Sequence, residues 1–278
     1  MKSEDKIKNE MLKIERTLWT KNENTWCPGC PDYYILISAR KAIAKLIDEG
    51  YKKENFVMAA GIGCHGKIFD YLDINGIYGL HGRVLPLLLG MKSGNPKLTV
   101  LGFAGDGDTY SEGMSHFIHA GRYNADTTLI VHDNQSFSLT TGQATATTQK
   151  GYKSKAEPLG NFNEPLDPIK LALASGVSFI ARCNARDVEH TAEIIEKAIR
   201  HKGFSFVEVI QDCIIFNLEV NNKDKLMYKI PDNADRKKAM EIAEEWDYSK
   251  KEGRIPLGVI FKEERKTLTE NYQQLNKK

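Results

Sequence analysis

Gly105-Asp106-Gly107-Asp108 combines two glycines with two carboxylates, and Asn134 follows 28 residues after Asp106. Glycines allow a backbone to approach a diphosphate closely, and the N–H groups at the start of a helix attract anions. The Asp106 carboxylate, the Asn134 amide oxygen and the backbone carbonyl of Ser136 are hard oxygen ligands of the kind that Mg²⁺ or Ca²⁺ requires. The pattern therefore predicts a metal-assisted diphosphate site, with two unrelated turns as the alternative.

The cysteines form a second candidate site. There are five of them, an odd number that argues against a disulfide framework, and two form the pair Cys27-x-x-Cys30. Together with Cys64 and Cys213 this pair makes four ligands, enough for one 4Fe–4S cluster. A structural zinc site normally has a second close pair of ligands, and a thioredoxin-like redox pair leaves Cys64 and Cys213 unexplained. Cys183 is expected to be a buried structural thiol.

The elements that must position these residues alternate between strands and helices. Short apolar runs predict buried strands at Phe56–Ala60, Leu98–Ala104, Thr127–Val131, Val177–Ala181 and Phe204–Ile210. Helical patterns lie around them at Asp32–Leu46, Val84–Met91, Tyr110–Tyr123, Pro168–Ser175 and Asp187–His201. This alternation predicts an α/β fold with a doubly wound, mostly parallel sheet.

The candidate motifs share one position relative to this sheet. Gly61-Ile62-Gly63-Cys64, Gly105–Asp108 and Asp133-Asn134 each come directly after a predicted strand. In doubly wound sheets, ligands bind beyond the carboxyl ends of the strands. We therefore expect the three motifs to meet at one edge, beneath a long loop at Lys150–Asp167.

The two ends of the chain differ from its centre. Residues 1–25 are expected to be a helical extension, because Ile7, Met11, Leu12, Ile14 and Leu18 fit one helix face. Residues 26–213 are expected to form the cofactor-binding domain. Residues 214–278 contain a polar helix at Asp232–Glu245 and an apolar stretch at Ile255–Phe261, and are expected to be an extension that contacts the domain or a partner. Its candidate interface residues are Trp246, Tyr248, Ile255, Leu257 and Ile260.

Composition excludes several classes of protein. The 278 residues are 41% hydrophobic and 27% charged, as in ordinary globular proteins, and the net charge of +2 implies no nucleic acid or other polyanionic partner. No apolar run approaches the ~20 residues that a membrane-spanning helix needs, and the charged N-terminus does not look like a signal peptide. A cytoplasmic location is expected.

The motifs together resemble one known family. Trp26–Cys30, Gly61–Cys64, the segment from His81 to Pro86, Gly105–Asp108 and Thr141-Gly142-Gln143 follow one another between about residues 20 and 217. In order and spacing they are similar to the cofactor-binding beta subunits of 2-oxoacid:ferredoxin oxidoreductases, the pyruvate:ferredoxin oxidoreductase family. Gly-Asp-Gly followed by Asn is the metal motif of thiamine diphosphate enzymes.

The resemblance implies a role for each matching position. Asp106, Asn134 and the Ser136 carbonyl would hold Mg²⁺, and Cys27, Cys30, Cys64 and Cys213 would hold the 4Fe–4S cluster. Lys67 would face the substrate carboxylate, and His65 would donate to the diphosphate or to a carboxylate, or fill the turn. The implied thiamine diphosphate contacts are Ile62, Gly63, Cys64, His65, His81, Gly82, Arg83, Gly105, Gly107, Asp108, Ser138 and Leu139.

Three positions depart from the family pattern. His65 stands where the family usually has a small residue, and Thr109–Gly113 is poorer in glycine than in many members. No basic residue near Thr141 is present to meet a distal substrate carboxylate. These departures border the site, so they bear on the identity of the 2-oxoacid rather than on the cofactor.

The implied reaction is the oxidative decarboxylation of a 2-oxoacid, with electrons passing to ferredoxin and the acyl group to coenzyme A. No glutamate that would activate the cofactor can be identified here, so an alpha-type catalytic subunit is expected as partner, with gamma- or delta-type subunits possible. A non-redox thiamine diphosphate decarboxylase or synthase subunit would not need the four cysteines. A non-enzymatic metal-binding scaffold would not need Asp106 and Asn134 at this spacing.

Overall fold

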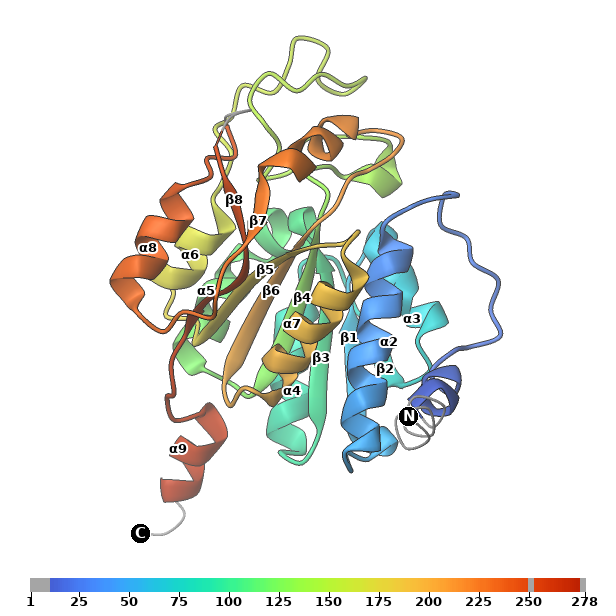
Figure 1. Cartoon of the computed structure of the whole chain (residues 1–278), viewed down its shortest axis with the longest axis vertical. Helices are drawn as coiled ribbons and strands as arrows, with labels where there is room; N and C mark the ends of the chain where they lie inside the picture. The colour runs from blue at the N-terminus through green and yellow to red at the C-terminus, as the bar shows by residue number, and fades with distance from the viewer. Residues whose placement is uncertain (1–10, 250–252, 276–278) are drawn as a thin grey trace, which may run out of the picture.

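Figure 1 shows the computed structural model, which describes residues 11–249 and 253–275, apart from the side chains of residues 219–222. Eight strands in this part of the chain form one sheet, in the order β2-β1-β3-β4-β6-β5-β8-β7. All neighbouring strands are parallel except β5 and β8, which are antiparallel. The strands are β1 Phe56–Ala60, β2 Asn75–Tyr78, β3 Thr99–Gly105, β4 Thr127–Asp133, β5 Phe179–Asn184, β6 Phe204–Ile210, β7 Met227–Lys229 and β8 Ile255–Lys262.

Helices cover both faces of the sheet. The α-helices are α2 Asp32–Asp48, α3 Ile68–Tyr71, α4 Val84–Gly94, α5 Met114–Tyr123, α6 Pro168–Ala174, α7 Val188–Arg200, α8 Arg236–Glu244 and α9 Leu268–Leu275. Short 3₁₀ turns are η1 Lys53–Asn55, η2 Cys64–Lys67, η4 Ser138–Thr140 and η5 Leu218–Leu226, and η3 Gly107–Glu112 is a π-helical turn. Residues 11–16 are helical too, whereas Ile7 lies outside the described residues.

The core has one layer on each side of the sheet. Side chains alternate along a strand, so Phe103 and Ile130 pack toward α2 and α7, whereas Ala104 and Leu129 pack toward α4, α5 and α6. In Figure 1, α2 and α7 lie side by side in front of the sheet. Burial on both faces explains why the central strands are almost continuously apolar.

The predicted α/β fold with a doubly wound, mostly parallel sheet is confirmed. All five predicted strands are present, and β1 and β6 have the predicted bounds. The predicted helix over Tyr110–Tyr123 is interrupted: η3 ends at Glu112, and α5 begins at Met114. The sequence patterns did not predict β2, whose four residues are all exposed and begin with Asn-Gly, a pair typical of turns.

The segment after Cys213 is part of the sheet. Strand β8 pairs with β5, and β7 pairs with β8. Trp246, Tyr248, Ile255, Leu257 and Ile260 are each at most 4% exposed. The prediction that these five side chains form a partner interface is therefore wrong, because they pack inside this chain. Among the described residues, no helix has the length and apolar character needed to cross a membrane.

A buried ion pair joins this C-terminal segment to the core. Arg182 on β5 donates from Nε to Glu208 Oε2 on β6 at 2.6 Å, and the Tyr248 hydroxyl donates to the other Glu208 oxygen. All three side chains are fully or almost fully buried. Loss of one partner in such a pair leaves an uncompensated charge in the interior.

Replacing Arg182 by Met is expected to destabilise the fold by about 3–5 kcal/mol, because Glu208 would lose its cation. Chemical denaturation followed by circular dichroism measures this. Arg200→Met is the matched control: its ion pairs with Glu49 and Glu196 are at the surface, where each pair contributes about 0–1 kcal/mol. Equal losses for the two variants would contradict the assignment.

Candidate functional site

A cavity opens at the carboxyl ends of the central strands. It gathers the turn after β1, the turn after β3 and the segment after β4, as the parallel topology requires. In Figure 1 the chain between β4 and α6 and the turn η5 both lie beyond this end of the sheet. The lining residues are Ile62, Gly63, Cys64, His65, His81, Gly105, Asp106, Gly107, Asp108, His132, Asn134, Ser136, Phe137, Ser138, Leu139, Thr140 and Gln211.

Asp106, which lines this cavity, and Asp133 are two buried carboxylates that lie close to each other. The Thr147 hydroxyl lies 2.9 Å from Asp106 Oδ2 and 3.0 Å from Asp133 Oδ1, so the two acids share one partner. Burial raises the pKa of Asp106 to about 6, although hydrogen bonds from Thr145 and Thr147 oppose the shift. Burial also raises the pKa of Asp133 well above its usual value, helped by the charges of Asp106 and Glu208. A bound cation would stabilise the ionised form of both groups.

The turn from Asn134 to Ser136 has an unusual backbone. Gln135 has φ of 55°, in the left-handed region that non-glycine residues seldom adopt. The turn is held in place because Asn134 Oδ1 accepts from Ser136 N, and Asn217 Nδ2 donates to the carbonyls of Asn134 and Gln135. Such local strain often marks a functional site, and here it lies at the predicted metal ligands.

Asp108 connects three of the predicted motifs. Its Oδ1 accepts from the backbone N–H of Gly82 at 2.5 Å, and His81 Nδ1 lies 3.6 Å from the same oxygen. Its Oδ2 lies 3.5 Å from His65 Nε2. His65 Nε2, His81 Nδ1 and Asp108 Oδ2 are buried and have no hydrogen-bond partner among the described residues. Unpartnered polar atoms at the wall of a cavity indicate that a ligand or water satisfies them.

The glycines leave room that side chains would fill. A Cβ on Gly105 would lie 2.7 Å from His65 Nδ1, and a Cβ on Gly107 would lie 2.2 Å from Phe137 Cε1. His65 and Phe137 thus pack directly against the Gly-Asp-Gly backbone, and both line the cavity. Glycine is needed at both positions because these rings occupy the space that a side chain would take.

The four predicted cluster ligands are all free thiols. Trp26 Nε1 donates to the Cys64 carbonyl at 2.7 Å, which ties the Cys27–Cys30 turn to the turn after β1. Burial raises the pKa of the Cys64 thiol to about 12, and the charges of Asp32, Cys213 and Cys27 contribute to the rise. Burial likewise raises the pKa of Cys30, with Asp32 and Cys64 adding to it. Cys183, by contrast, is fully buried in the core, with its thiol 3.8 Å from the Glu208 carbonyl on β6.

As the side chains are placed, no three His, Cys, Asp or Glu residues of the described chain lie close enough together to hold a metal ion. The structure thus brings the predicted ligand residues to one end of the sheet without showing a formed metal or cluster site.

The turn that carries Cys64 depends on a close backbone approach. A Cβ on Gly66 would lie 2.1 Å from the Gly61 carbonyl oxygen and 2.5 Å from the Tyr78 hydroxyl. Gly66→Ala is therefore expected to lower the stability by roughly 1–3 kcal/mol, as overpacking does. Gly90→Ala in α4 is the control, because its Cβ would meet nothing within 4 Å and should stabilise the helix by up to ~1 kcal/mol. Thermal unfolding distinguishes the two; a Gly66→Ala protein as stable as the wild type would contradict the packing argument.

Six predicted site residues do not line the cavity: Lys67, Gly82, Arg83 and the cluster candidates Cys27, Cys30 and Cys213. Lys67 Nζ donates to the Thr25 carbonyl at 2.9 Å. Arg83 Nη1 contacts the carbonyls of Gly82 and Glu112, and Gly82 contributes its N–H to Asp108. Their predicted functions stay predictions, with Arg83 and Gly82 placed to support the wall rather than to form it.

The sequence patterns did not predict four of the cavity residues: His132, Phe137, Thr140 and Gln211. For two of them, the position in the sequence could have indicated a place in the site. His132 directly precedes Asp133-Asn134, and Gln211 directly follows the predicted strand Phe204–Ile210. Polar residues at the carboxyl end of a buried strand lie at the ligand edge of such a sheet. Their side-chain direction, however, is visible only in the structure.

Known proteins match both parts of the chain. The fold and the cavity define a thiamine-diphosphate-binding domain, since residues 61–209 match the family model described as the C-terminal TPP binding domain of thiamine pyrophosphate enzymes. Residues 220–277 match the C-terminal model of the pyruvate ferredoxin oxidoreductase beta subunit. The chain belongs to the beta subunits of 2-oxoacid:ferredoxin oxidoreductases.

Individual relatives agree with this assignment. The chain is 39% identical to the 2-oxoacid:ferredoxin oxidoreductase subunit beta of Saccharolobus solfataricus, over 90% of this chain and 85% of that protein. It is 41% identical to the 2-oxoglutarate synthase subunit KorB of Archaeoglobus fulgidus, over 68% of this chain and 69% of that one. The chain is also similar to a solved structure of 2-oxoglutarate:ferredoxin oxidoreductase from Magnetococcus marinus, which has 2-oxoglutarate, coenzyme A and succinyl-CoA bound. The two chains superpose with a TM-score of 0.88 at 30% sequence identity, over 95% of this chain and 89% of that chain.

Proposed function

We propose that this chain binds thiamine diphosphate, Mg²⁺ and one 4Fe–4S cluster, in an enzyme that oxidatively decarboxylates a 2-oxoacid and forms an acyl-CoA. The observation that carries this proposal is the single cavity that joins the Gly105–Asp108 turn, the strained Asn134–Ser136 turn and the turn bearing Cys64. A diphosphate site beside a cysteine set is the combination that a redox thiamine enzyme needs. When bound, thiamine diphosphate would supply the nucleophilic carbon and the electron sink for decarboxylation.

The residues present fit the cation. Asp106 and Asp133 are buried carboxylates that share one hydroxyl, and a divalent cation would offset the cost of burying their charge. Asp106, the Asn134 side chain and the Ser136 carbonyl would hold Mg²⁺ as oxygen ligands. The backbone at Gly105 and Gly107 would face the diphosphate, and Ser138 and Leu139 would lie along the cofactor beyond it.

The residues also fit the cluster. Cys27, Cys30, Cys64 and Cys213 are free thiols, and burial raises the pKa of Cys30 and of Cys64. Metal binding requires the thiolate, so iron would reverse the raised pKa values that burial imposes on Cys30 and Cys64. The cluster would lie beside the cavity wall formed by Cys64 and would accept electrons from the reaction.

The protein side of the reaction is binding, orientation and exclusion of water. His65 and His81 would donate to the diphosphate or to a substrate carboxylate, and Asp108 would hold both rings in place. Lys67 would need to leave the Thr25 carbonyl to reach a substrate, which a partner subunit or a bound 2-oxoacid could bring about.

An alpha-type partner subunit would complete the site, and gamma- or delta-type subunits are compatible with this arrangement. The enzyme would act in the cytoplasm, with ferredoxin as electron acceptor.

Anaerobic co-purification from the native host, followed by iron, sulfide and thiamine analysis, tests the composition. Reduction of ferredoxin that depends on 2-oxoacid and coenzyme A tests the reaction. Activity of the isolated chain would refute the need for a partner, and stoichiometric zinc without sulfide would refute the cluster.

A non-redox thiamine diphosphate decarboxylase or synthase is not favoured. Such an enzyme would use the cavity but would give no function to Cys27, Cys30 and Cys213. A 2-oxoacid decarboxylation that releases aldehyde and transfers no electrons to ferredoxin or to a viologen dye would support it instead.

A further inference from the structure

A buried carboxylate outside the predicted site holds two walls of the cavity. Asp32 is the first residue of α2 and is 1% exposed. Its Oδ1 accepts from His132 Nδ1 at 2.7 Å and from Gln211 Nε2 at 3.1 Å. His132 is the last residue but one of β4, and Gln211 directly follows β6, so one oxygen fixes side chains at the ends of two neighbouring strands.

His132 and Gln211 each leave one polar atom without a partner. His132 is 1% exposed and Gln211 is 4% exposed, and both line the cavity. His132 Nε2 and Gln211 Oε1 are buried and make no hydrogen bond to any residue that the structure describes. A buried polar atom without a partner costs about 1–3 kcal/mol, so two of them at one cavity wall call for a ligand.

The contacts to Asp32 decide the chemistry of these two atoms. The Gln211 amide uses its NH₂ group toward Asp32, so its free atom Oε1 is an acceptor. Asp32 Oδ1 contacts both the Gln211 amide, which donates to it, and His132 Nδ1, so this oxygen is an acceptor and the proton shared with His132 lies on Nδ1. Nε2 of a neutral imidazole in that tautomer is also an acceptor.

From this pair of acceptors we infer that Asp32, His132 and Gln211 form a subsite that binds a hydrogen-bond donor group of a ligand in the cavity. The inference rests on the proposed function, which supplies two ligands with such a group. One is the amino group of the thiamine diphosphate pyrimidine, and the other is the thiol of coenzyme A. The 2-oxoacid itself carries only acceptors when ionised, so it is not the ligand of this subsite. Asp32 is a positioning residue, because it acts through His132 and Gln211.

A structural role alone does not explain the free atoms. The contact between Asp32 and His132 joins α2 to β4, but it uses only Nδ1 of the imidazole and does not require Nε2. His132→Asn separates the two functions, since the Asn amide can replace Nδ1 toward Asp32 but does not reach the position of Nε2. His132→Gln places its amide near the position of Nε2 and gives up the contact with Asp32. Gln211→Met removes the second acceptor and keeps a side chain of similar length.

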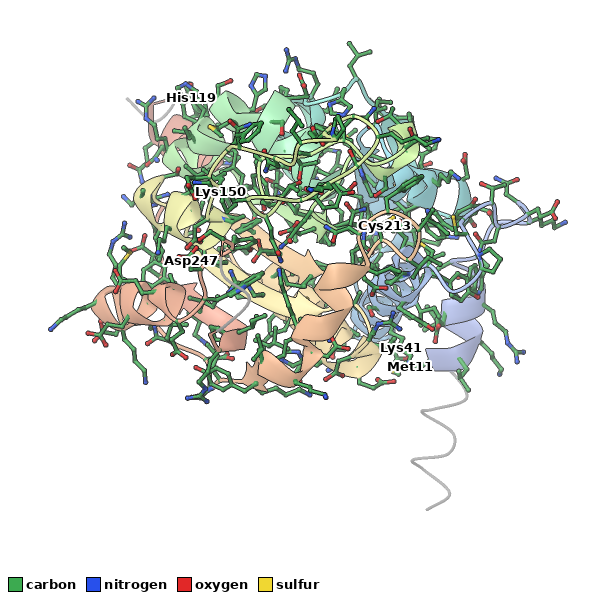
Figure 2. All side chains as sticks on the ribbon, turned by 90° about the horizontal axis from the view of Figure 1, so that it is seen from above. Met11, Lys41, His119, Lys150, Cys213 and Asp247 are labelled. Carbon is green, nitrogen blue, oxygen red and sulfur yellow. The ribbon has the colours of Figure 1, made fainter. Side chains whose placement is uncertain are left out.

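The experiment measures binding to the enzyme complex, purified with its partner subunits and freed of thiamine diphosphate. Calorimetric titrations use four probes: thiamine diphosphate with Mg²⁺, inorganic diphosphate with Mg²⁺, coenzyme A, and a coenzyme A analogue without the thiol. His119→Asn is the matched control. His119 is exposed on α5, and in the view from above in Figure 2 it lies at the rim of the molecule, well apart from Cys213.

His132→Asn and Gln211→Met are each expected to weaken binding of one donor-bearing probe by roughly tenfold, the usual effect of one lost hydrogen bond. A loss with thiamine diphosphate but not with inorganic diphosphate assigns the amino group. A loss with coenzyme A but not with its thiol-free analogue assigns the thiol. His132→Gln should recover part of the affinity, and His119→Asn should match the wild type.

Three outcomes overturn the inference. The first is unchanged affinity for both donor-bearing probes in His132→Asn and Gln211→Met proteins that unfold at the wild-type temperature. The second is an equal loss with inorganic diphosphate, which would show that the residues bind phosphate. The third is a wild-type complex that binds no thiamine diphosphate, which refutes the proposed function and with it this inference. If His132→Asn fails to fold, the folded Gln211→Met protein is tested in its place, and wild-type affinity for both donor-bearing probes then counts against the subsite.

Discussion

Cys64→Ser is expected to abolish or strongly reduce the iron and acid-labile sulfide content of anaerobically purified protein. Cys64 lines the cavity, and its charge couples to those of Cys27, Cys30 and Cys213. A 4Fe–4S cluster needs four thiolates, and a serine hydroxyl at one corner is a poor replacement for a soft ligand. Iron and sulfide assays, together with EPR of the reduced protein, measure the loss.

Cys183→Ser is the matched control for this variant. Cys183 is fully buried on β5, and its thiol lies 3.8 Å from the Glu208 carbonyl in the core. The substitution is expected to leave the cluster intact and to alter only stability. A Cys183→Ser protein without iron, or a Cys64→Ser protein with a full complement of iron and sulfide, would contradict the ligand assignment.

Asp106→Ala is expected to weaken binding of thiamine diphosphate in the presence of Mg²⁺ by ~10–100-fold or more, the scale on which disturbed metal ligation acts. Asp106 is 2% exposed and lies between the two glycines that face the cavity. Its removal takes away the one charged group of the proposed Mg²⁺ ligands. Isothermal titration with and without EDTA measures the effect, because chelation should weaken the wild type and change the variant little.

Asp48→Ala controls for the loss of a carboxylate. Asp48 is the last residue of α2 and is exposed, at the end of that helix away from Asp32. Its replacement should leave the affinity for thiamine diphosphate unchanged. Equal affinity of wild type and Asp106→Ala, or insensitivity of the wild type to EDTA, would show that Asp106 is no metal ligand.

The sequence by itself determined the parts of this protein that local chemistry specifies. Buried parallel strands need apolar residues on both faces, so β1, β3, β4, β5 and β6 were readable from apolar runs. The same rule placed Gly61–Cys64, Gly105–Asp108 and Asn134 at one edge, because the carboxyl ends of parallel strands meet there. Ligand types and spacing then gave the class of cofactor.

The sequence also failed where exposure or pairing decides the structure. Strand β2 is exposed along its length, so nothing in its composition separates it from a loop. Strand β8 was visible as an apolar stretch, but its antiparallel pairing with β5 depends on the whole sheet. Trp246 and Tyr248 were predicted to contact a partner, but they are buried inside this chain. A large apolar residue among charged ones fits both a core and an interface, and the sequence alone does not distinguish the two.

Only the tertiary structure decided which polar atoms face the cavity and which are already used. It showed Lys67 engaged with the Thr25 carbonyl, a contact between two segments 42 residues apart. It also brought Asp32, 100 residues before His132 and 179 before Gln211, onto both of those side chains. Hydrogen bonds between residues so far apart leave no periodicity in the sequence, because they follow from how α2 packs on the ends of β4 and β6.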